Sequence, residues 1–200
     1  HLSHCQLDRN GRHGAIVLSG ASMVLEHSQC CDNEGCGCVA TETGSSIRAT
    51  SSTADRNKGD GASAWSGSSM VLEHSQCCDN KGDGWGAQGT GSSIRAASSR
   101  ADRNKRYGAA AADGGAIALE LSQCCDNKGA GWVAQDTGSI HATSSTADRN
   151  GEDGACAFSG TSMVLENSQC CENEGCGWGA QGTGSSICAA SSKADRNKRC

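Results

Sequence analysis

One unit of about 47 residues recurs through the chain. The pair Cys-Cys begins at positions 30, 77, 124 and 170, and the triplet Asp-Arg-Asn begins at 8, 55, 102, 148 and 195, so both markers repeat every 46 or 47 residues. Repeats of this length are supersecondary units that bury their apolar faces against neighbouring copies. The sequence predicts a tandem array with a partial repeat at 1–18, repeats at 19–65, 66–112 and 113–158, and a truncated repeat at 159–200. Both ends interrupt a unit at the same place, which suggests a segment of a longer array, with a natural chain of four units as the alternative.

Large apolar residues are scarce in every unit. Leu, Ile, Val and Phe together make up 21 of 200 residues, whereas there are 28 Gly, 15 Cys and no Pro. Ordering a residue costs about 1–2 kcal/mol of backbone entropy, and burying a large apolar side chain returns only about 1.5–3 kcal/mol. We therefore expect order to depend on disulfides, metal, a partner surface or contacts between repeats.

Residues 70–78 predict the first element of a unit. Met70, His74 and Cys77 lie at helical spacing, Ser68 can cap the start, and the polar segment 79–82 can end the helix. A strand is the alternative, because the run is short. After a Gly-rich loop at 82–91, a second, weaker helix begins near Ser92. The predicted fold is a loop-rich array with one or two short helices per unit. The alternative is an irregular disulfide-stapled or largely disordered chain.

The cysteine residues give the strongest indication of the chemistry of the chain, which is disulfide linkage between units. Neighbouring Cys residues rarely bond each other, because their Cα atoms are only about 3.8 Å apart. Each member of a pair is therefore expected to link to a different neighbouring unit, which favours an oxidising, extracellular compartment for a secreted protein. The disulfide candidates are Cys30, Cys31, Cys77, Cys78, Cys124, Cys125, Cys170 and Cys171.

A thiolate metal site is the alternative use of these residues. Zinc, or another thiophilic metal, takes four nitrogen or sulfur ligands. The candidate ligands are His27, Cys30, Cys31, Cys36, Cys38, His74, Cys77 and Cys78. The third and fourth units carry Leu121 and Asn167 in place of the histidine. The same site therefore cannot recur in every unit, and no cofactor is the first expectation.

The pattern of functional residues predicts a non-enzymatic structural or matrix-type protein that self-associates through its Cys-Cys pairs. No catalytic motif is present, and no small-molecule substrate is evident. The net charge of −5 disfavours nucleic acid, and no apolar run approaches the roughly 18 residues of a membrane span. The alternatives are a metal-binding repeat protein, a partner-binding array or a translated DNA repeat without evolved function. In the partner-binding array, the contact residues are Trp85, Trp132 and Trp178.

Overall fold

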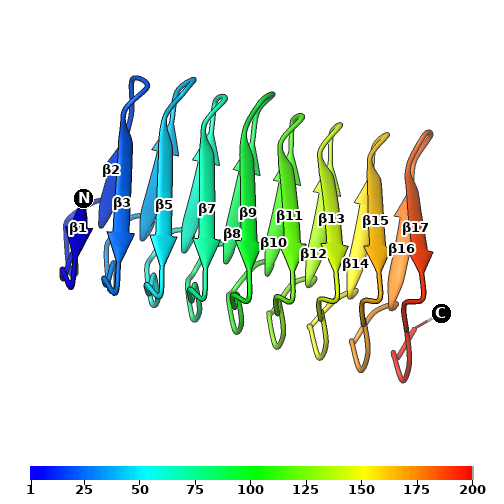
Figure 1. Ribbon diagram of the computed structural model, residues 1–200. Coiled ribbons are helices and arrows are strands. Elements are labelled where there is room, and N and C mark those ends of the chain that lie inside the picture. Colours follow the sequence, from blue (N-terminus) through cyan, green and yellow to red (C-terminus); the bar gives the residue numbers. More distant parts are fainter. Residues whose placement is uncertain (200) are drawn as a thin grey trace.

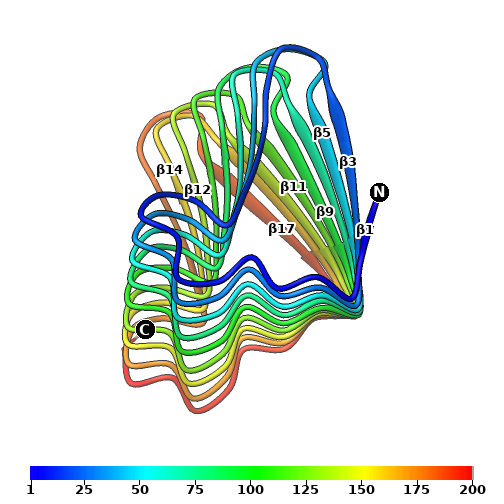
Figure 2. The same ribbon diagram turned by 90° about the vertical axis from the view of Figure 1, so that its left-hand side faces the viewer.

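The computed structural model describes residues 1–199 and shows a solenoid of stacked β-strands (Figure 1). Each turn of 23 or 24 residues adds one strand to each of two parallel sheets, which have nine and eight strands. Viewed along the stack, the two sheets and a long irregular segment surround the interior (Figure 2), the lumen of the solenoid, which buried side chains fill. Within residues 1–199 every named element is a strand. The predicted helices and the alternative of a largely disordered chain are therefore wrong.

The strands of each sheet follow one another along the solenoid at every second element. The nine-stranded sheet consists of β1 (Leu2–Ser3), β3 (Ser22–Glu26), β5 (Ser46–Thr50), β7 (Ser69–Glu73), β9 (Ser93–Ala97), β11 (Ala116–Glu120), β13 (Ser139–Thr143), β15 (Ser162–Glu166) and β17 (Ser186–Ala190). The eight-stranded sheet consists of β2 (Ala15–Val17), β4 (Cys38–Thr41), β6 (Ala62–Trp65), β8 (Trp85–Gln88), β10 (Ala109–Ala112), β12 (Trp132–Gln135), β14 (Ala155–Phe158) and β16 (Trp178–Gln181).

The segment predicted as the first helix is strand β7 followed by a sharp turn. Met70 and Leu72 are buried in the lumen while the residues between and beside them face outward, which is the two-residue period of a strand. His74 then takes a φ of 50°, a left-handed conformation that turns the chain. The helix prediction relied on the spacing of Met70, His74 and Cys77. Only Met70 belongs to β7, and the other two residues lie at or beyond the turn. The strand alternative was correct.

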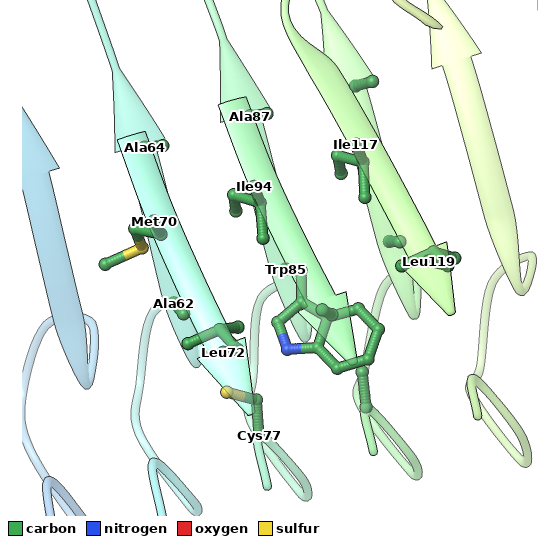
Figure 3. Packing of buried hydrophobic residues seen from close by; sticks show 14 of the residues in the cluster. Ala62, Ala64, Met70, Leu72, Cys77, Trp85, Ala87, Ile94, Ile117 and Leu119 are labelled. Carbon is green, nitrogen blue, oxygen red and sulfur yellow. The ribbon is translucent and has the colours of Figure 1, made fainter. Parts of the chain in front are cut away.

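The 47-residue unit corresponds to two turns of the solenoid, because large and small side chains alternate in the lumen. Trp85 pairs in register with Ala109 of the next turn, and Ala96 pairs with Leu119. A turn with a large residue in one sheet thus has a small residue in the other. The Trp85 ring lies between Leu72 and Leu119 of the two neighbouring turns (Figure 3). This alternation fills a thin core mainly with Ala, Cys and a few large residues, which explains the scarcity of large apolar residues.

Polar ladders replace much of the missing apolar core. One asparagine of each turn hydrogen-bonds its side-chain amide to the side-chain oxygen of the asparagine one turn further. Between Asn33 and Asn173 these side chains are buried. A glycine four residues after the asparagine lets the chain pass close to its neighbours. A Cβ at Gly84, for example, would lie 2.4 Å from the Cβ of Ala101. The stacked turns are therefore held by hydrogen bonds as well as by apolar contacts.

An ion-pair ladder runs along the outer surface beside the asparagine ladder. Arginine and aspartate alternate on successive turns, and each arginine forms two hydrogen bonds to the aspartate one turn before it. The pairs are Arg56 with Asp32, Arg103 with Asp79, and Arg149 with Asp126. The positive and negative charges of this column therefore compensate each other. Separately, no helix within residues 1–199 is long and apolar enough to cross a membrane.

Candidate functional site

A groove of about 300 Å³ lies on the outer face of the eight-stranded sheet, over β6, β8, β10 and β12. Aromatic, amide and charged side chains line it, which distinguishes it from the Ala-rich lumen behind the same strands. The side chains that can contact a ligand are Asp60, Trp65, Asp83, Gln88, Arg106, Tyr107 and Gln135.

The two carboxylates of the groove belong to a column of residues that precede the glycine of each turn. Where the residue one turn earlier is an aspartate or a histidine, the next residue of the column donates its backbone N–H to that side chain. The N–H of Asp83 donates to Oδ1 of Asp60 at 2.8 Å, and the N–H of Tyr107 donates to Oδ1 of Asp83 at 3.0 Å. The same geometry joins Cys36 to Nδ1 of His13 at 3.0 Å. Stacking therefore places Asp60, Asp83 and Tyr107 on three consecutive turns.

Asp60 is fixed by hydrogen bonds to both of its carboxylate oxygens. Oδ1 accepts the backbone N–H of Asp83, and Oδ2 accepts the hydroxyl of Ser63 at 2.8 Å. Gly86 adds no side chain above this carboxylate, and a Cβ there would lie 3.3 Å from Oδ2 of Asp60. Asp60 is thus a rigid negative charge beside Asp83.

Asp83 is a buried carboxyl group whose pKa is raised. It is only 5% exposed, and its burial, followed by the charge of Asp60, raises its pKa to about 6. The N–H of Tyr107 occupies Oδ1, while Oδ2 lies 3.4 Å from Nη1 of Arg106. Oδ2 is therefore the oxygen that the backbone leaves available, and it changes protonation state near neutral pH.

The walls of the groove suit a sugar ring. Trp65 is half-buried on β6, and the guanidinium of Arg106 lies 5.2 Å from the centre of the Tyr107 ring. Aromatic faces pack against the C–H faces of sugars, whereas Gln88 and Gln135 offer amide groups for hydroxyls. Arg106 can bind an anionic substituent next to Asp83.

A second outer pocket of about 420 Å³ lies farther along the same sheet. Tyr107, Val133 and Phe158 form its apolar part, and Asp153 occupies the column position of Asp60 and Asp83. Cys156 donates its thiol to Oδ2 of Asp153 at 3.1 Å. Asp153 therefore serves as a matched control for Asp83 in a pocket of different composition.

The eight predicted disulfide cysteines are buried free thiols, so the disulfide staples are a wrong prediction. Equivalent residues of two 47-residue units lie two turns apart, which is about 9–10 Å along the stack and beyond the roughly 7 Å limit for a disulfide. Ala54 occupies the intervening position between Cys30 and Cys77. Burial also raises the pKa of Cys78 to about 12. The Cys-Cys pairs are buried side chains that pack between turns. The glycines that recur along the chain allow neighbouring turns to approach closely.

The predicted metal ligands are divided among three regions of the solenoid. Cys30, Cys38 and Cys77 face the lumen, whereas Cys36 belongs to the outer column. The other candidates lie in the segments between strands: His27, Cys31, His74 and Cys78. The His27 ring stacks on His4 at 5.1 Å. Among residues 1–199, no group of three or more His, Cys, Asp or Glu side chains is arranged to hold a metal ion.

Two of the three predicted partner-contact residues are inaccessible. Trp85 and Trp132 are 0% exposed in the lumen, and Trp178 is partly buried against the same core. Trp85 and Trp132 can contact no partner in the folded chain, because they fill the lumen opposite small residues. Trp65 is partly exposed like Trp178, and the sequence did not single it out. It pairs in register with Thr41 and Gln88, and no local sequence pattern marks this position.

Comparison with known proteins identifies the fold. Residues 1–147 match the family model described as the right-handed β-helix region. This chain belongs to the right-handed β-helix proteins. The match covers well over half of the sequence and replaces the predicted helical array. No curated protein matches this chain.

Three solved structures are similar to this chain in fold. The A-module of the Azotobacter vinelandii mannuronan C-5 epimerase AlgE4 has a TM-score of 0.57 and 14% identity, over 88% of this chain and 60% of that structure. The A-module of AlgE6 has a TM-score of 0.51 and 10% identity, over 85% and 64%. Pectate lyase Pel9A has a TM-score of 0.47 and 18% identity, over 88% and 60%. This β-helix chain spans less than two thirds of each structure.

These similarities correct one further expectation. The prediction of a non-enzymatic protein rested on the lack of catalytic motifs, and it is overturned because the fold is shared with epimerase modules. At 10–14% identity the comparison concerns the fold alone. The activity of this β-helix protein must therefore be argued from its own groove.

Proposed function

We propose that this β-helix protein binds an anionic polysaccharide in the outer groove and transfers a proton at one of its uronate units. The adjacent carboxylates Asp60 and Asp83, with the pKa of Asp83 raised to about 6, are the observation that carries the proposal. A general acid or base works best when its pKa is near the working pH. Asp83 meets this condition because of its burial and its neighbour.

The groove supplies the other parts that such a reaction needs. The hydrogen at C-5 of a uronate is acidified by the adjacent carboxylate, and its removal places negative charge on that carboxylate. Arg106, next to Oδ2 of Asp83, is placed to stabilise this charge. Tyr107 carries a hydroxyl that can exchange a proton on the same substrate unit. Trp65 and the two glutamines hold the neighbouring sugar rings.

The polysaccharide also bears on where the protein works. Acidic polysaccharides are largely polymers of cell surfaces and extracellular matrices, so the extracellular setting predicted from the sequence fits the proposal. The support comes from the substrate class and no longer from disulfides. Self-association, a structural role and a thiophilic metal are sequence predictions that the fold does not test.

The proposal is tested by incubating the protein with polymannuronate and polygalacturonate and following the sugar signals by proton NMR. Wild type is expected to change the uronate signals, and Asp83→Asn to lose at least a hundredfold in rate, the lower range for a general acid or base. Asp153→Asn, the matched control, keeps the wild-type rate. Asp60→Asn lowers the pKa of Asp83 and shifts the rate profile to lower pH. Full turnover by Asp83→Asn, or wild type inert on both polymers, would contradict the proposal.

A further inference from the structure

Four lysines form a ladder beside the groove. The backbone N–H of each donates at 2.9 Å to the carbonyl oxygen of an asparagine one turn earlier, so all four occupy one position on consecutive turns. Their side chains are exposed, and successive turns are about 4.8 Å apart. The lysine ladder consists of Lys58, Lys81, Lys105 and Lys128.

Most of the charge of the lysine ladder is uncompensated. Lys58 forms an ion pair with Glu34 at 2.6 Å, but Lys81, Lys105 and Lys128 have no ion-pair partner in the part of the chain that the structure describes. Two residues earlier in each turn, the Arg/Asp ladder pairs its charges completely. The structure therefore concentrates three unpaired positive charges in a line, although the whole chain has a net charge of −5.

The lysine ladder runs alongside the carboxylates of the groove. Lys81 precedes Asp83 by two residues, so their Cα atoms are at most about 7 Å apart. Lys105 directly precedes Arg106, which lines the groove. A chain bound along the solenoid axis can therefore contact the lysines while one of its units lies at Asp83.

We propose that Lys81, Lys105 and Lys128 bind a linear anionic polysaccharide along the solenoid axis and so favour long chains over short ones. This inference rests on the proposed function for the class of substrate. A polyuronate carries one carboxylate per sugar, and the length of a sugar unit is comparable with the spacing of the turns. A single-stranded nucleic acid would need aromatic platforms for its bases. The residues directly before the four lysines are Asn, and those directly after them are Gly in three turns and Arg106 in the fourth. No aromatic side chain therefore stands directly beside a lysine of the ladder.

Binding of long polymannuronate, measured by fluorescence anisotropy as a function of salt, tests the ladder. Three charge contacts predict that wild-type affinity falls about 20-fold between about 50 and 200 mM salt, by analogy with counterion release from nucleic acids. In the triple variant K81Q/K105Q/K128Q, most of this salt dependence disappears and binding at low salt weakens about 20-fold. The single variant K105Q, at an exposed position, shows a smaller loss in the same direction.

The matched control is the triple variant R56Q/R103Q/R149Q, which changes the net charge equally within the compensated Arg/Asp ladder. It is expected to retain wild-type binding and salt dependence. Equal losses in both triple variants would overturn the proposal, because net charge alone would then explain binding. Unchanged binding in the lysine variants, or tighter binding of single-stranded DNA of equal charge, would also overturn it.

Turnover of short and long chains separates this inference from the proposed function. The lysine triple variant is expected to convert a uronate trisaccharide at the wild-type rate and to lose its preference for the polymer. Asp83→Asn is expected to bind the polymer normally without converting it. Equal loss of trisaccharide and polymer turnover in the lysine variant would overturn the ladder proposal alone. If wild type binds the polymer through the lysines but does not convert it, only the proposed function is overturned.

Discussion

The side-chain amide of Asn80 donates to Oδ1 of Asn104, one turn further along the solenoid, at 3.1 Å. The backbone N–H of Asn80 donates to the same oxygen at 3.0 Å, and its side-chain amide also donates to the carbonyl of Ala54 at 3.0 Å. Both asparagines are 0% exposed. Each asparagine thus joins three turns, and the ladder is a buried network in which the members depend on one another.

Asn104→Ala is expected to destabilise the protein by about 2–3 kcal/mol, because it leaves two buried donors of Asn80 without an acceptor. Urea unfolding followed by circular dichroism measures this loss. Asn10→Ala is the matched control at the exposed end of the same ladder, and it is expected to cost less than about 1 kcal/mol. Equal losses in the two variants would contradict a role for burial in the ladder.

The period visible in the sequence was twice the structural period, and this caused the wrong fold prediction. Ser75 and Asn80 stand five residues apart, and Ser99 and Asn104 repeat that spacing 24 residues later. The residues between them differ, with Cys-Cys in one turn and Ala-Asp in the next. Because large and small lumen residues must alternate, neighbouring turns look dissimilar and only every second turn looks alike. The 47-residue repeat could be predicted from the sequence. The strands could not, because predicting them requires recognition of the shorter repeat of 23 or 24 residues.

The groove could not be predicted from local motifs. Asp60 and Asp83 are 23 residues apart, and neither belongs to a recognisable catalytic pattern. Stacking of the turns brings them together, and the raised pKa of Asp83 depends on burial that only the folded chain provides. The cysteines gave the opposite error, because their number suggested chemistry where the structure uses them as small apolar side chains.

Two tryptophans separate stability from ligand binding. Trp85→Ala should cost about 3–5 kcal/mol, because the lumen ring is replaced by a cavity. Trp85→Phe should cost much less, since the buried Nε1 of Trp85 has no hydrogen-bond partner. Trp65→Ala should change the free energy of unfolding by less than about 1 kcal/mol and weaken oligouronate binding about tenfold, within the range for an aromatic contact. Urea unfolding and calorimetric titration measure both effects, and loss of binding without loss of stability in Trp85→Ala would contradict the assignment.

The burial of the Cys-Cys pairs predicts unequal thiol reactivity. Exposed Cys188 should react with a soluble disulfide reagent within minutes at pH 8, whereas Cys77 and Cys78 should react only after unfolding. Burial raises the pKa of Cys78 to about 12, so almost no thiolate is present at that pH. Mass spectrometry of the labelled peptides locates the reacted positions, and Cys188→Ser removes the fast label from the peptide that contains this position. Rapid labelling of Cys78 in the folded protein would refute this packing.

Asp83 should make stability depend on pH in the direction opposite to an ion-paired carboxylate. Its pKa is raised from 3.8 to about 6, so folding favours the protonated form. That contribution is complete below about pH 4 and is lost as the pH rises through about 6, by up to about 3 kcal/mol. Asp83→Asn stays neutral and keeps an oxygen for the N–H of Tyr107. The variant should therefore match wild type at pH 4 and exceed its free energy of unfolding at pH 8, as measured by urea titrations at both pH values. A variant less stable than wild type at pH 8 would show that the ionised carboxylate is stabilised in the groove. The expected gain, together with loss of turnover, would show that this β-helix protein sacrifices stability to keep a buried proton-transfer group beside its outer groove.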